Sequence, residues 1–388
     1  MTRVRIASPA LAAASPAARA GLPADLAFCH PAIRGVAAID RDAVELDVDA
    51  DADADADDLR AQVSQVIALS IASYRFVRPT APLWRHDALA RYADGGAGLA
   101  GFIAAHTVEL GPGQYALCGP AAELRTWVDA RLRALAIGFG AEAWHLPSVE
   151  QSADLLRSTG YLASHAQHVT FGYRLPCHFD RLRAFAADAR DRKLERPDDP
   201  RDLEPTGFIL EPFVCHNVYR ALRGARLDAG RAITALGTCY RHEGFRFQPL
   251  LRQWEFSMRE VVLVGPAAYV AAQRDRLLLL TRELAARLDL DARLEIATDP
   301  FFVSEAASAR TFQAMQSTKV ELTLALDAQR GVAASSFNLH GSHFTAPMEI
   351  TDRAGALLET ACVGWGIERW MAAIVARWGA DPAGWPRT

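Results

Sequence analysis

The feature that most constrains this chain is a pair of apolar segments joined by an arginine-rich loop, at 239–265 (CYRHEGFRFQPLLRQWEFSMREVVLVG). The pattern predicts a first β-strand that ends at Arg241 and Glu243, and a second that carries Arg252, Phe256 and Glu260, each four residues from the next. Such a hairpin can clamp a triphosphate, with Arg241 and Arg252 on different phosphates and Phe256 against a base. An arginine-rich hairpin is also typical of a solvated sheet edge, so the pattern alone leaves both interpretations open.

The rest of the chain predicts an α+β fold built on a largely antiparallel sheet. Short β-like segments follow one another from residue 108 onward, and helical patterns separate them, notably at 121–139, 267–288 and 353–377. Strands and crossover helices do not alternate as they do in doubly wound folds. Neither common glycine-rich phosphate loop is present, so side chains must hold any bound nucleotide.

Composition excludes several classes of protein. The 388 residues carry a formal charge of −4, but seven aspartates lie in the tract DVDADADADADD at 47–58, and without them the charge is +3. This mild excess is not the surface expected of a general nucleic-acid binder. No run of about 18 uncharged apolar residues indicates a membrane span. The six cysteines are far apart, which favours free thiols in a reducing cytoplasm over a disulfide framework.

The arginine-rich stretch resembles motif 2 of the class II aminoacyl-tRNA synthetases, which is Arg-x-Glu, a loop and Arg-x-x-x-Phe. Their motif 3, Gly-x-Gly-x-x-Arg opening a helix, has a match in CVGWGIER at 362–369. Motif 1, a helix running into a strand that ends at a proline, has a match at 124–149 with Pro147. The segment that follows motif 1, GYLASHAQHVTF at 160–171, resembles the corresponding segment of seryl-tRNA synthetases.

This resemblance covers roughly 110–377 and includes the three motifs in their proper order. It implies a class II synthetase-like antiparallel sheet of six or seven strands flanked by helices, ATP bound in a bent form, and a homodimer built on motif 1. We therefore expect a low-complexity, flexible N-terminal extension (1–58), a helical segment (59–107) and the catalytic domain (108–388). The Asp-Ala repeat of the extension has no apolar periodicity, and its charges repel one another.

Three residues narrow the resemblance to a subfamily. Cys215, in EPFVC, stands where seryl-tRNA synthetases carry the Glu of a Pro-Thr-x-Glu strand, while Glu260 ends motif 2 and Cys362 opens motif 3. Cys, Glu and Cys on neighbouring strands make a three-ligand zinc site with an open fourth position. That set occurs in the atypical methanogen-type seryl-tRNA synthetases and in their truncated relatives, the amino acid:[carrier protein] ligases. Spacings of 45 and 102 residues are by themselves no evidence for zinc, and two buried thiols beside a salt-bridged Glu are the alternative.

The remaining cysteines and several histidines receive no role from the motifs. Core or surface thiols and polar-tipped histidines are their commoner interpretations. These residues are Cys29, Cys118, Cys177, Cys239, His216, His242, His340 and His343.

The resemblance also implies roles for individual residues. Zinc on Cys215, Glu260 and Cys362 would take the neutral α-amino group of the substrate. The catalytic residues would be Arg241, which bridges the α-phosphate and the substrate carboxylate, with Glu243 and Arg369. The remaining ATP contacts would come from Arg252 and Arg369 on the outer phosphates, Phe256 and Arg369 on either side of the adenine, and Glu321 on magnesium.

The regions outside the motifs indicate whether a tRNA or a carrier protein accepts the activated amino acid. The first 110 residues have no sustained heptads and no basic face, and 19 residues follow Arg369. We therefore expect no tRNA, and an ATP-dependent ligase that activates a small amino acid, glycine or alanine, and loads it onto the phosphopantetheine thiol of a carrier protein. The alternatives are a seryl-type aminoacyl-tRNA synthetase and a non-catalytic regulatory paralogue. Segment 302–318 is the candidate carrier-docking helix, and 181–203 is interpreted as a solvated charged helix.

Overall fold

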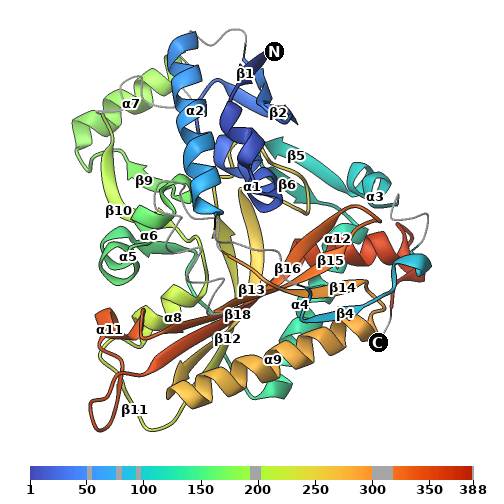
Figure 1. Cartoon of the computed structure of the whole chain (residues 1–388). Coiled ribbons are helices and arrows are strands. Elements are labelled where there is room, and N and C mark those ends of the chain that lie inside the picture. Colours follow the sequence, from blue (N-terminus) through green and yellow to red (C-terminus); the bar gives the residue numbers. More distant parts are fainter. Residues whose placement is uncertain (50–54, 76–80, 93–97, 193–201, 299–317, 387–388) are drawn as a thin grey trace.

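An eight-stranded sheet forms the centre of the molecule (Figure 1). The computed structural model describes residues 1–49, 55–75, 81–92, 98–192, 202–298 and 318–386. The strands run in the order β4-β14-β15-β16-β18-β13-β12-β7, and all neighbours pair antiparallel except β7 and β12. The predicted α+β fold is confirmed, and two short edge strands, β4 and β7, raise the strand number above the expected six or seven. The bounds are Trp84–His86 (β4), Glu142–Ala143 (β7), Arg231–Tyr240 (β12), Glu255–Gly265 (β13), Ala292–Ile296 (β14), Lys319–Ala325 (β15), Gly331–Gly341 (β16) and Glu359–Gly366 (β18).

Three long helices cover one face of this sheet: α4 (Pro120–Phe139), α9 (Ala267–Arg287) and α12 (Ile367–Trp378). The sequence encodes the limits of α4, which has a proline in its first turn and ends at Gly140 in the left-handed conformation, φ 105°. Strand β13 is valine-rich and buried on both faces, as is typical of a central strand. The main hydrophobic core therefore lies between these helices and the central strands.

The opposite face of the sheet carries short elements instead of long helices. Helices α8 (Cys215–Ala221) and α11 (Thr345–Met348) pack there in a smaller apolar cluster with β13 and β18. The sequence prediction that Cys215 lies on a strand is wrong, because β10 (Glu204–Leu210) ends earlier and Cys215 begins α8. Pro212 lies between them and has no N–H to donate to a continuing ladder.

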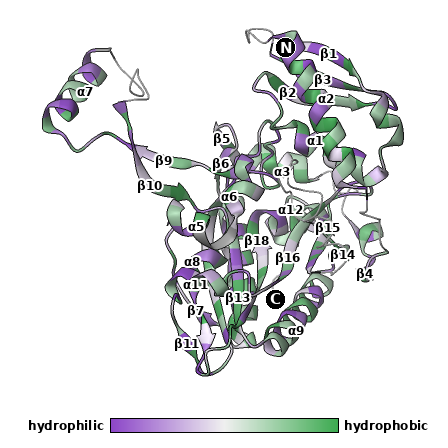
Figure 2. Cartoon of the chain, turned by 60° about the vertical axis from the view of Figure 1, so that its left-hand side comes forward, coloured by the Kyte–Doolittle hydropathy of each residue, from purple (hydrophilic) through white to green (hydrophobic). Residues whose placement is uncertain are grey.

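A projecting arm extends from this side of the molecule (Figure 2). Strand β10 pairs with β8 (Val149–Gln151) and with β9 (Phe171–Arg174), and the segment between β9 and β10 carries α7 (Phe179–Arg192). The described side chains of α7 are mostly exposed, and that of Phe179 is 74% exposed. This agrees with the solvated helix expected at 181–203, of which residues 193–201 lie outside the described part.

The N-terminal residues form a folded unit, and not the flexible extension that the sequence predicts for 1–58. Strands β1 (Thr2–Ala7), β2 (Ile33–Ile39) and β3 (Ala43–Val48) form a sheet in the order β1-β3-β2, packed on α1 (Pro16–Leu26) and α2 (Ala56–Ser73). We call these elements the N-terminal unit. The alanine- and aspartate-rich composition conceals a period-two apolar pattern, in which alternate residues of β3 pack in the core of the unit. The predicted helical segment (59–107) includes most of α2 and α3 (Gly98–His106) but also β4, a strand of the central sheet.

The described ends of the acidic tract have structural roles in this unit. Asp47 pairs with Arg3 at 3.3 Å, and Asp49 pairs with Arg34 at 2.9 Å. Asp55 caps the N-terminus of α2 by accepting a hydrogen bond from the backbone of Asp57 at 2.9 Å. Local capping and ion pairing therefore offset part of the repulsion on which the prediction of disorder rested.

Smaller elements complete the described chain. They are β5 (Thr107–Gly111), β6 (Gln114–Leu117), β11 (Arg226–Leu227), β17 (Thr351–Asp352), α3 (Gly98–His106), α5 (Ser152–Thr159), α6 (Tyr161–Ser164) and the 3-10 helices η1 (Pro9–Ala13), η2 (Leu89–Arg91), η4 (Ala166–His168) and η6 (Pro382–Gly384). Within the described ranges, no helix has both the length and the apolar character that crossing a membrane requires. The candidate carrier-docking helix at 302–318 lies outside the described residues, apart from Thr318.

Candidate functional site

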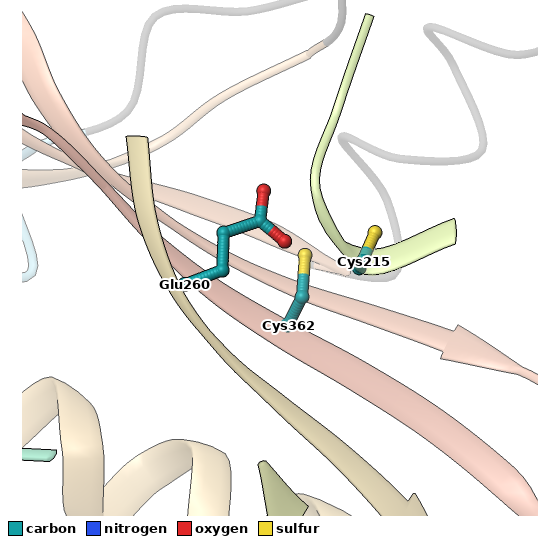
Figure 3. A group of neighbouring side chains, drawn as sticks. All are labelled: Cys215, Glu260 and Cys362. Atoms are coloured by element: carbon teal, nitrogen blue, oxygen red, sulfur yellow. The ribbon is translucent and has the colours of Figure 1, made fainter. Parts of the chain in front are cut away.

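Cys215, Glu260 and Cys362 meet on the face of the sheet opposite the long helices (Figure 3). Glu260 on β13 lies opposite Gly364 of β18, and Cys362 lies opposite Val262, so the two side chains are diagonal neighbours on one face. Cys215 approaches them from the start of α8. One ligand atom from each residue lies within 4.8 Å of the other two, and all three residues are buried. We call them the Cys–Glu–Cys cluster.

Side-chain hydrogen bonds hold α8, and with it Cys215, in this position. Asn217 Nδ2 donates to the carbonyl oxygen of Pro147 at 3.1 Å. Arg220 Nε donates to Asp154 Oδ2 at 3.0 Å. Both acceptors lie in or just after the segment that resembles motif 1, so this segment positions the third member of the cluster.

Burial, a hydrogen bond between the thiols and the proximity of acidic groups together set the pKa values in the cluster. A hydrogen bond between the thiols raises the pKa of Cys215 and lowers the pKa of Cys362. Burial, together with the negative charge on Cys362, raises the pKa of Glu260 well above its usual value. Three acidic groups this close cannot all be anions without a compensating charge. A divalent cation would provide that charge and displace the protons.

The donor set fits a zinc-type ion. Two sulfur ligands and one carboxylate leave a fourth tetrahedral position for a substrate group. Glu260 Oε2 is buried and has no hydrogen-bond partner among the described residues, which is costly for a carboxylate oxygen unless a ligand pairs with it. The described parts of the chain contain no other group of three or more His, Cys, Asp or Glu residues with ligand atoms this close.

Two residues that the motifs did not select contact the sulfur of Cys362. Asn338 on β16 lies directly opposite Cys362, and its Nδ2 donates to the sulfur at 3.4 Å. His340 Nε2 lies 3.8 Å from the same sulfur, while its Nδ1 faces Thr360 Oγ1 at 3.3 Å. Such neighbours orient metal ligands and tune their charge. The strand register could have identified Asn338, but the register is not readable from one sequence.

The other histidines near the motifs have packing contacts. His216 is fully buried and pairs with Glu150. The ring of His242 meets Trp254 edge-on at 5.3 Å, and the ring of His343 meets Phe344 in the same way at 4.9 Å. Of the four histidines considered from the sequence, His340 contacts the Cys–Glu–Cys cluster, through the sulfur of Cys362.

A second cluster, rich in arginine, lies beside the first. Arg241 directly follows β12, and Glu243 accepts hydrogen bonds from Arg246 Nη2 at 2.9 Å and from Arg252 Nη1 at 2.7 Å. Arg369 lies on α12, and burial together with the charges of Arg252, Glu243 and Arg241 shifts its pKa. We call Arg241, Glu243, Arg246, Arg252 and Arg369 the arginine cluster.

The cluster carries more positive than negative charge. Burial, followed by the nearby charge of Arg252, lowers the pKa of Arg246 to about 10, and the same two causes lower the pKa of Arg369 to about 10. Glu243 opposes these effects but is one carboxylate among four guanidinium groups. Crowded, partly desolvated arginines of this kind favour a polyanion such as a nucleotide phosphate chain.

The loop between β12 and β13 corrects one prediction. Arg252 was expected on the second strand, but β13 begins at Glu255 and Arg252 lies in the loop. The loop folds back on itself, because Leu250 has a left-handed φ of 62° and Gln248 pairs with Arg252 across an isolated bridge. Arg252 therefore reaches Glu243 from the side of the loop.

Arg241 connects the two clusters. Its guanidinium lies over the Phe256 ring, 5.3 Å from the centroid, and its Nε donates to the Pro212 carbonyl at 2.9 Å. Its positive charge also lowers the pKa of Glu260, against the larger effect of burial. A substrate that contacted Arg241 would thus be close to both clusters.

Glu321, the candidate magnesium ligand, lies on β15 opposite Ser336 of β16, which in turn lies opposite Gly364. This places Glu321 in the same cross-strand row as Glu260. Its Oε1 forms an ion pair with Lys319 Nζ at 3.1 Å, and its negative charge raises the pKa of Arg369, against the larger lowering effect of burial. The carboxylate therefore interacts with the arginine cluster and with a lysine.

Comparison with known proteins gives relatives of two kinds. The chain is 35% identical over 192 residues to "Amino acid--[acyl-carrier-protein] ligase 2" of Bradyrhizobium diazoefficiens, covering 49% of this chain and 57% of that protein. It is 31% identical over 250 residues to ligase 1 of the same organism, covering 64% and 74%. It is also 32% identical over 191 residues to the type-2 serine–tRNA ligase of Methanocaldococcus jannaschii, covering 47% and 37%. No family model matches the chain.

Among solved structures, the seryl-tRNA synthetase of M. kandleri, in complex with A. aeolicus tRNASec, matches with a TM-score of 0.68 and 21% identity. This match covers 93% of this chain and 73% of the other. The fold is therefore that of the class II synthetases. By its sequence the chain belongs to the amino acid–[acyl-carrier-protein] ligases, which confirms the family resemblance. It spans less than two thirds of the length of ligase 2 and of the M. jannaschii enzyme.

Proposed function

We propose that this chain activates a small amino acid with ATP and transfers it to the phosphopantetheine thiol of a carrier protein. One observation carries the proposal: an acidic Cys–Glu–Cys cluster and an arginine cluster lie close together, linked by the charge of Arg241 on Glu260. The Cys–Glu–Cys cluster would bind an α-amino acid through a metal ion, and the arginine cluster would bind the phosphates of ATP. Family membership supports the same pairing.

The chain's own residues would act mainly by positioning and charge neutralisation. Arg241 would hold the substrate carboxylate against the α-phosphate, and Arg252 and Arg369 would neutralise the outer phosphates. Glu243 would fix the arginines that flank it, while Phe256 would offer its face to the adenine. Attack by the carboxylate oxygen on the α-phosphorus releases pyrophosphate and forms an aminoacyl-adenylate. Attack by the carrier thiol then releases AMP and forms a thioester.

We propose zinc as the ion for Cys215, Glu260 and Cys362. When bound there, zinc supplies a Lewis acid whose open position accepts a neutral α-amino group. Asn338 and His340 would keep Cys362 oriented as an anion. Glu321 is the proposed magnesium ligand, since carboxylate oxygens suit that ion.

The choice of glycine or alanine rests on the family and on crowding near Cys362. The Phe344 ring stacks on Tyr219 at 4.7 Å and meets His340 edge-on at 4.9 Å. Bulky side chains beside the cluster support a substrate with a small side chain. We also propose a homodimer built on motif 1, whose exposed apolar residues include Ile137 and Val149.

A specific observation supports the seryl-type aminoacyl-tRNA synthetase as a second candidate. The match to the M. kandleri enzyme covers 93% of this chain, so it includes most of the folded N-terminal unit. The expectation of no tRNA rested on the lack of sustained heptads and of a basic face in the first 110 residues, and the described part of this region is folded. Charging of tRNA therefore stays as the alternative to be tested.

The acceptor is tested directly by incubating the full chain with ATP, zinc, magnesium and radiolabelled glycine, alanine or serine. One sample receives a phosphopantetheinylated carrier protein, another the carrier without phosphopantetheine, and a third total tRNA. Label on the phosphopantetheinylated carrier alone supports the proposal. Label on tRNA alone supports the synthetase, and no adenylate with any amino acid supports a regulatory paralogue.

A further inference from the structure

The N-terminal unit lies directly against the loop that carries the arginine cluster. A Cβ atom added to Gly244 would lie 2.6 Å from the backbone oxygen of Ala27, at the end of α1. Gly244 also has a left-handed φ of 63°, which side chains disfavour. The two backbones therefore approach closely at a position that follows Glu243 immediately.

Phe28 adds an aromatic contact at the same place. Its ring lies 6.0 Å from the ring of His168 and 5.9 Å from that of His242, both in edge-on geometry. The backbone N–H of His242 donates to the carbonyl of His168 at 3.2 Å, so both rings belong to one fixed surface. His242 and Gly244 are the neighbours of Glu243 in the chain, and both contact the N-terminal unit.

Two further loop residues face the same unit. Phe245 packs against the apolar core that includes Leu26 and Leu59. The negative charge of Asp25 raises the pKa of Arg246, against the larger lowering effect of burial. Four loop residues around Glu243, which are His242, Gly244, Phe245 and Arg246, thus face the N-terminal part of the chain.

The other side of the loop has its own support. Phe247 fills the space beside Gly113 of the β5–β6 hairpin, where an added Cβ would lie 2.5 Å from a ring carbon. The Phe247 ring also stacks on Trp254, with centroids 6.2 Å apart. Because this side is held without the N-terminal unit, loss of the Phe28 contact should loosen residues 242–246 selectively.

We propose that the N-terminal unit positions the ATP-binding loop, with Phe28 as the positioning residue that acts through His242 and Glu243. Ordering this loop in advance lowers the entropy cost of binding a polyanion to it. The inference rests on the proposed function in one respect, which is that the arginine cluster binds ATP. It assigns to the N-terminal unit a role within the catalytic reaction that does not require tRNA.

The first test compares full-length wild type, Phe28→Ala and Phe28→Tyr. We expect Phe28→Ala to raise the dissociation constant of ATP, measured by calorimetry, by about tenfold, as for one immobilised side chain, and Phe28→Tyr to restore it. Hydrogen exchange of 242–246 should quicken in Phe28→Ala, while exchange around Phe247 and zinc content stay unchanged. The control is Leu46→Ala, a large-to-small change on β3 in the core of the same unit.

The second test uses two glycines with similar backbone conformations. Gly244→Ala adds a methyl group against Ala27, whereas Gly207→Ala, at φ 76°, adds one to open space on the arm. We expect weaker ATP binding only in Gly244→Ala. Unchanged ATP affinity and unchanged loop exchange in both Phe28→Ala and Gly244→Ala would overturn the proposal. If wild type binds no ATP, the proposed function fails, and loop exchange alone still decides whether Phe28 positions the loop.

Discussion

The Cys–Glu–Cys cluster and the arginine cluster are neighbours, linked by the charge of Arg241 on Glu260, but their charges are unbalanced in opposite directions. In the first, three acidic groups crowd together, and the pKa values of Cys215 and Glu260 are raised. In the second, four arginines crowd around Glu243, and the pKa values of Arg246 and Arg369 are lowered to about 10. Each cluster would thus be balanced by a ligand of opposite charge, as the proposed function requires.

The difference has a consequence for substrate recognition. An amino acid with a neutral amino group and a negative carboxylate can face both clusters at once, since Arg241 lies between them. The two clusters should therefore be separable by mutation, with one set of variants losing metal and the other losing nucleotide affinity.

The largest effect is expected when a sulfur ligand is removed. Cys362→Ala or Cys215→Ala should lower zinc affinity by more than about 100-fold, above the range seen for residues that only support a ligand. Amino acid activation should be lost, while ATP binding persists. Zinc per chain after dialysis, measured by mass spectrometry, checks this. The matched control is Cys239→Ala, a buried thiol on neighbouring β12 outside the cluster, which should keep its zinc.

The complementary variant is Arg369→Gln. Loss of a charged hydrogen-bond donor should raise the ATP dissociation constant roughly 10- to 100-fold, since such bonds contribute about 1.5–3 kcal/mol. Zinc content should not change. Arg174→Gln, an exposed arginine of the arm paired with Glu204, serves as control. If Arg369→Gln lost zinc as well, the clusters would not be separable.

A smaller effect is expected from the residues behind Cys362. His340→Phe removes the ring nitrogen 3.8 Å from the sulfur and should lower zinc affinity about tenfold. Competition with a chromophoric chelator measures it, and the absorption of the cobalt-substituted protein reports on the thiolates. His178→Phe, at an exposed position, should change neither. Unaltered affinity and spectrum in His340→Phe would restrict His340 to packing.

The smallest effect concerns stability on the side of the arginine cluster. Burial lowers the pKa of His168 to about 3, from 6.5 in the unfolded chain. Below pH 6.5 the unfolded chain therefore binds a proton that the folded chain does not, and stability falls as pH falls. By pH 5.5 the loss should be about 1 kcal/mol.

Urea unfolding of wild type and His168→Gln at pH 7.5 and pH 5.5 measures this loss. The variant should be less sensitive to acid than wild type by that amount. Equal acid sensitivity would mean that His168 does not titrate in this way.

The sequence predicted the regions whose chemistry is local in the chain. The Arg241-x-Glu243 pair and the helix opened after Gly366 follow from short patterns, and the structure has a hairpin and a helix there. The helical pattern at 353–377 was nevertheless wrong over 359–366, which form strand β18. Cys215 was assigned to the right neighbourhood but the wrong element, because a motif match does not reveal that Pro212 ends the strand. Asn338 was not found, because its contact with Cys362 depends on strand register.

The prediction that residues 1–58 are flexible was the largest error, and it has a physical reason. Its core uses alternate residues in short strands, such as Val44, Leu46 and Val48, beside a tract whose composition suggests disorder. Aspartates at the ends of that tract are paired or cap α2, which composition alone does not show. Tertiary packing therefore overrode the local signal.

The most direct test of the account is amino acid-dependent exchange of labelled pyrophosphate into ATP by the full chain, before and after chelation. We expect exchange with glycine or alanine, its loss when zinc is removed, and its recovery when zinc is restored. Exchange that is unaffected by complete removal of zinc would contradict the role assigned to Cys215, Glu260 and Cys362. Absence of exchange with every amino acid, in zinc-loaded protein that binds ATP, would contradict the proposed activation itself.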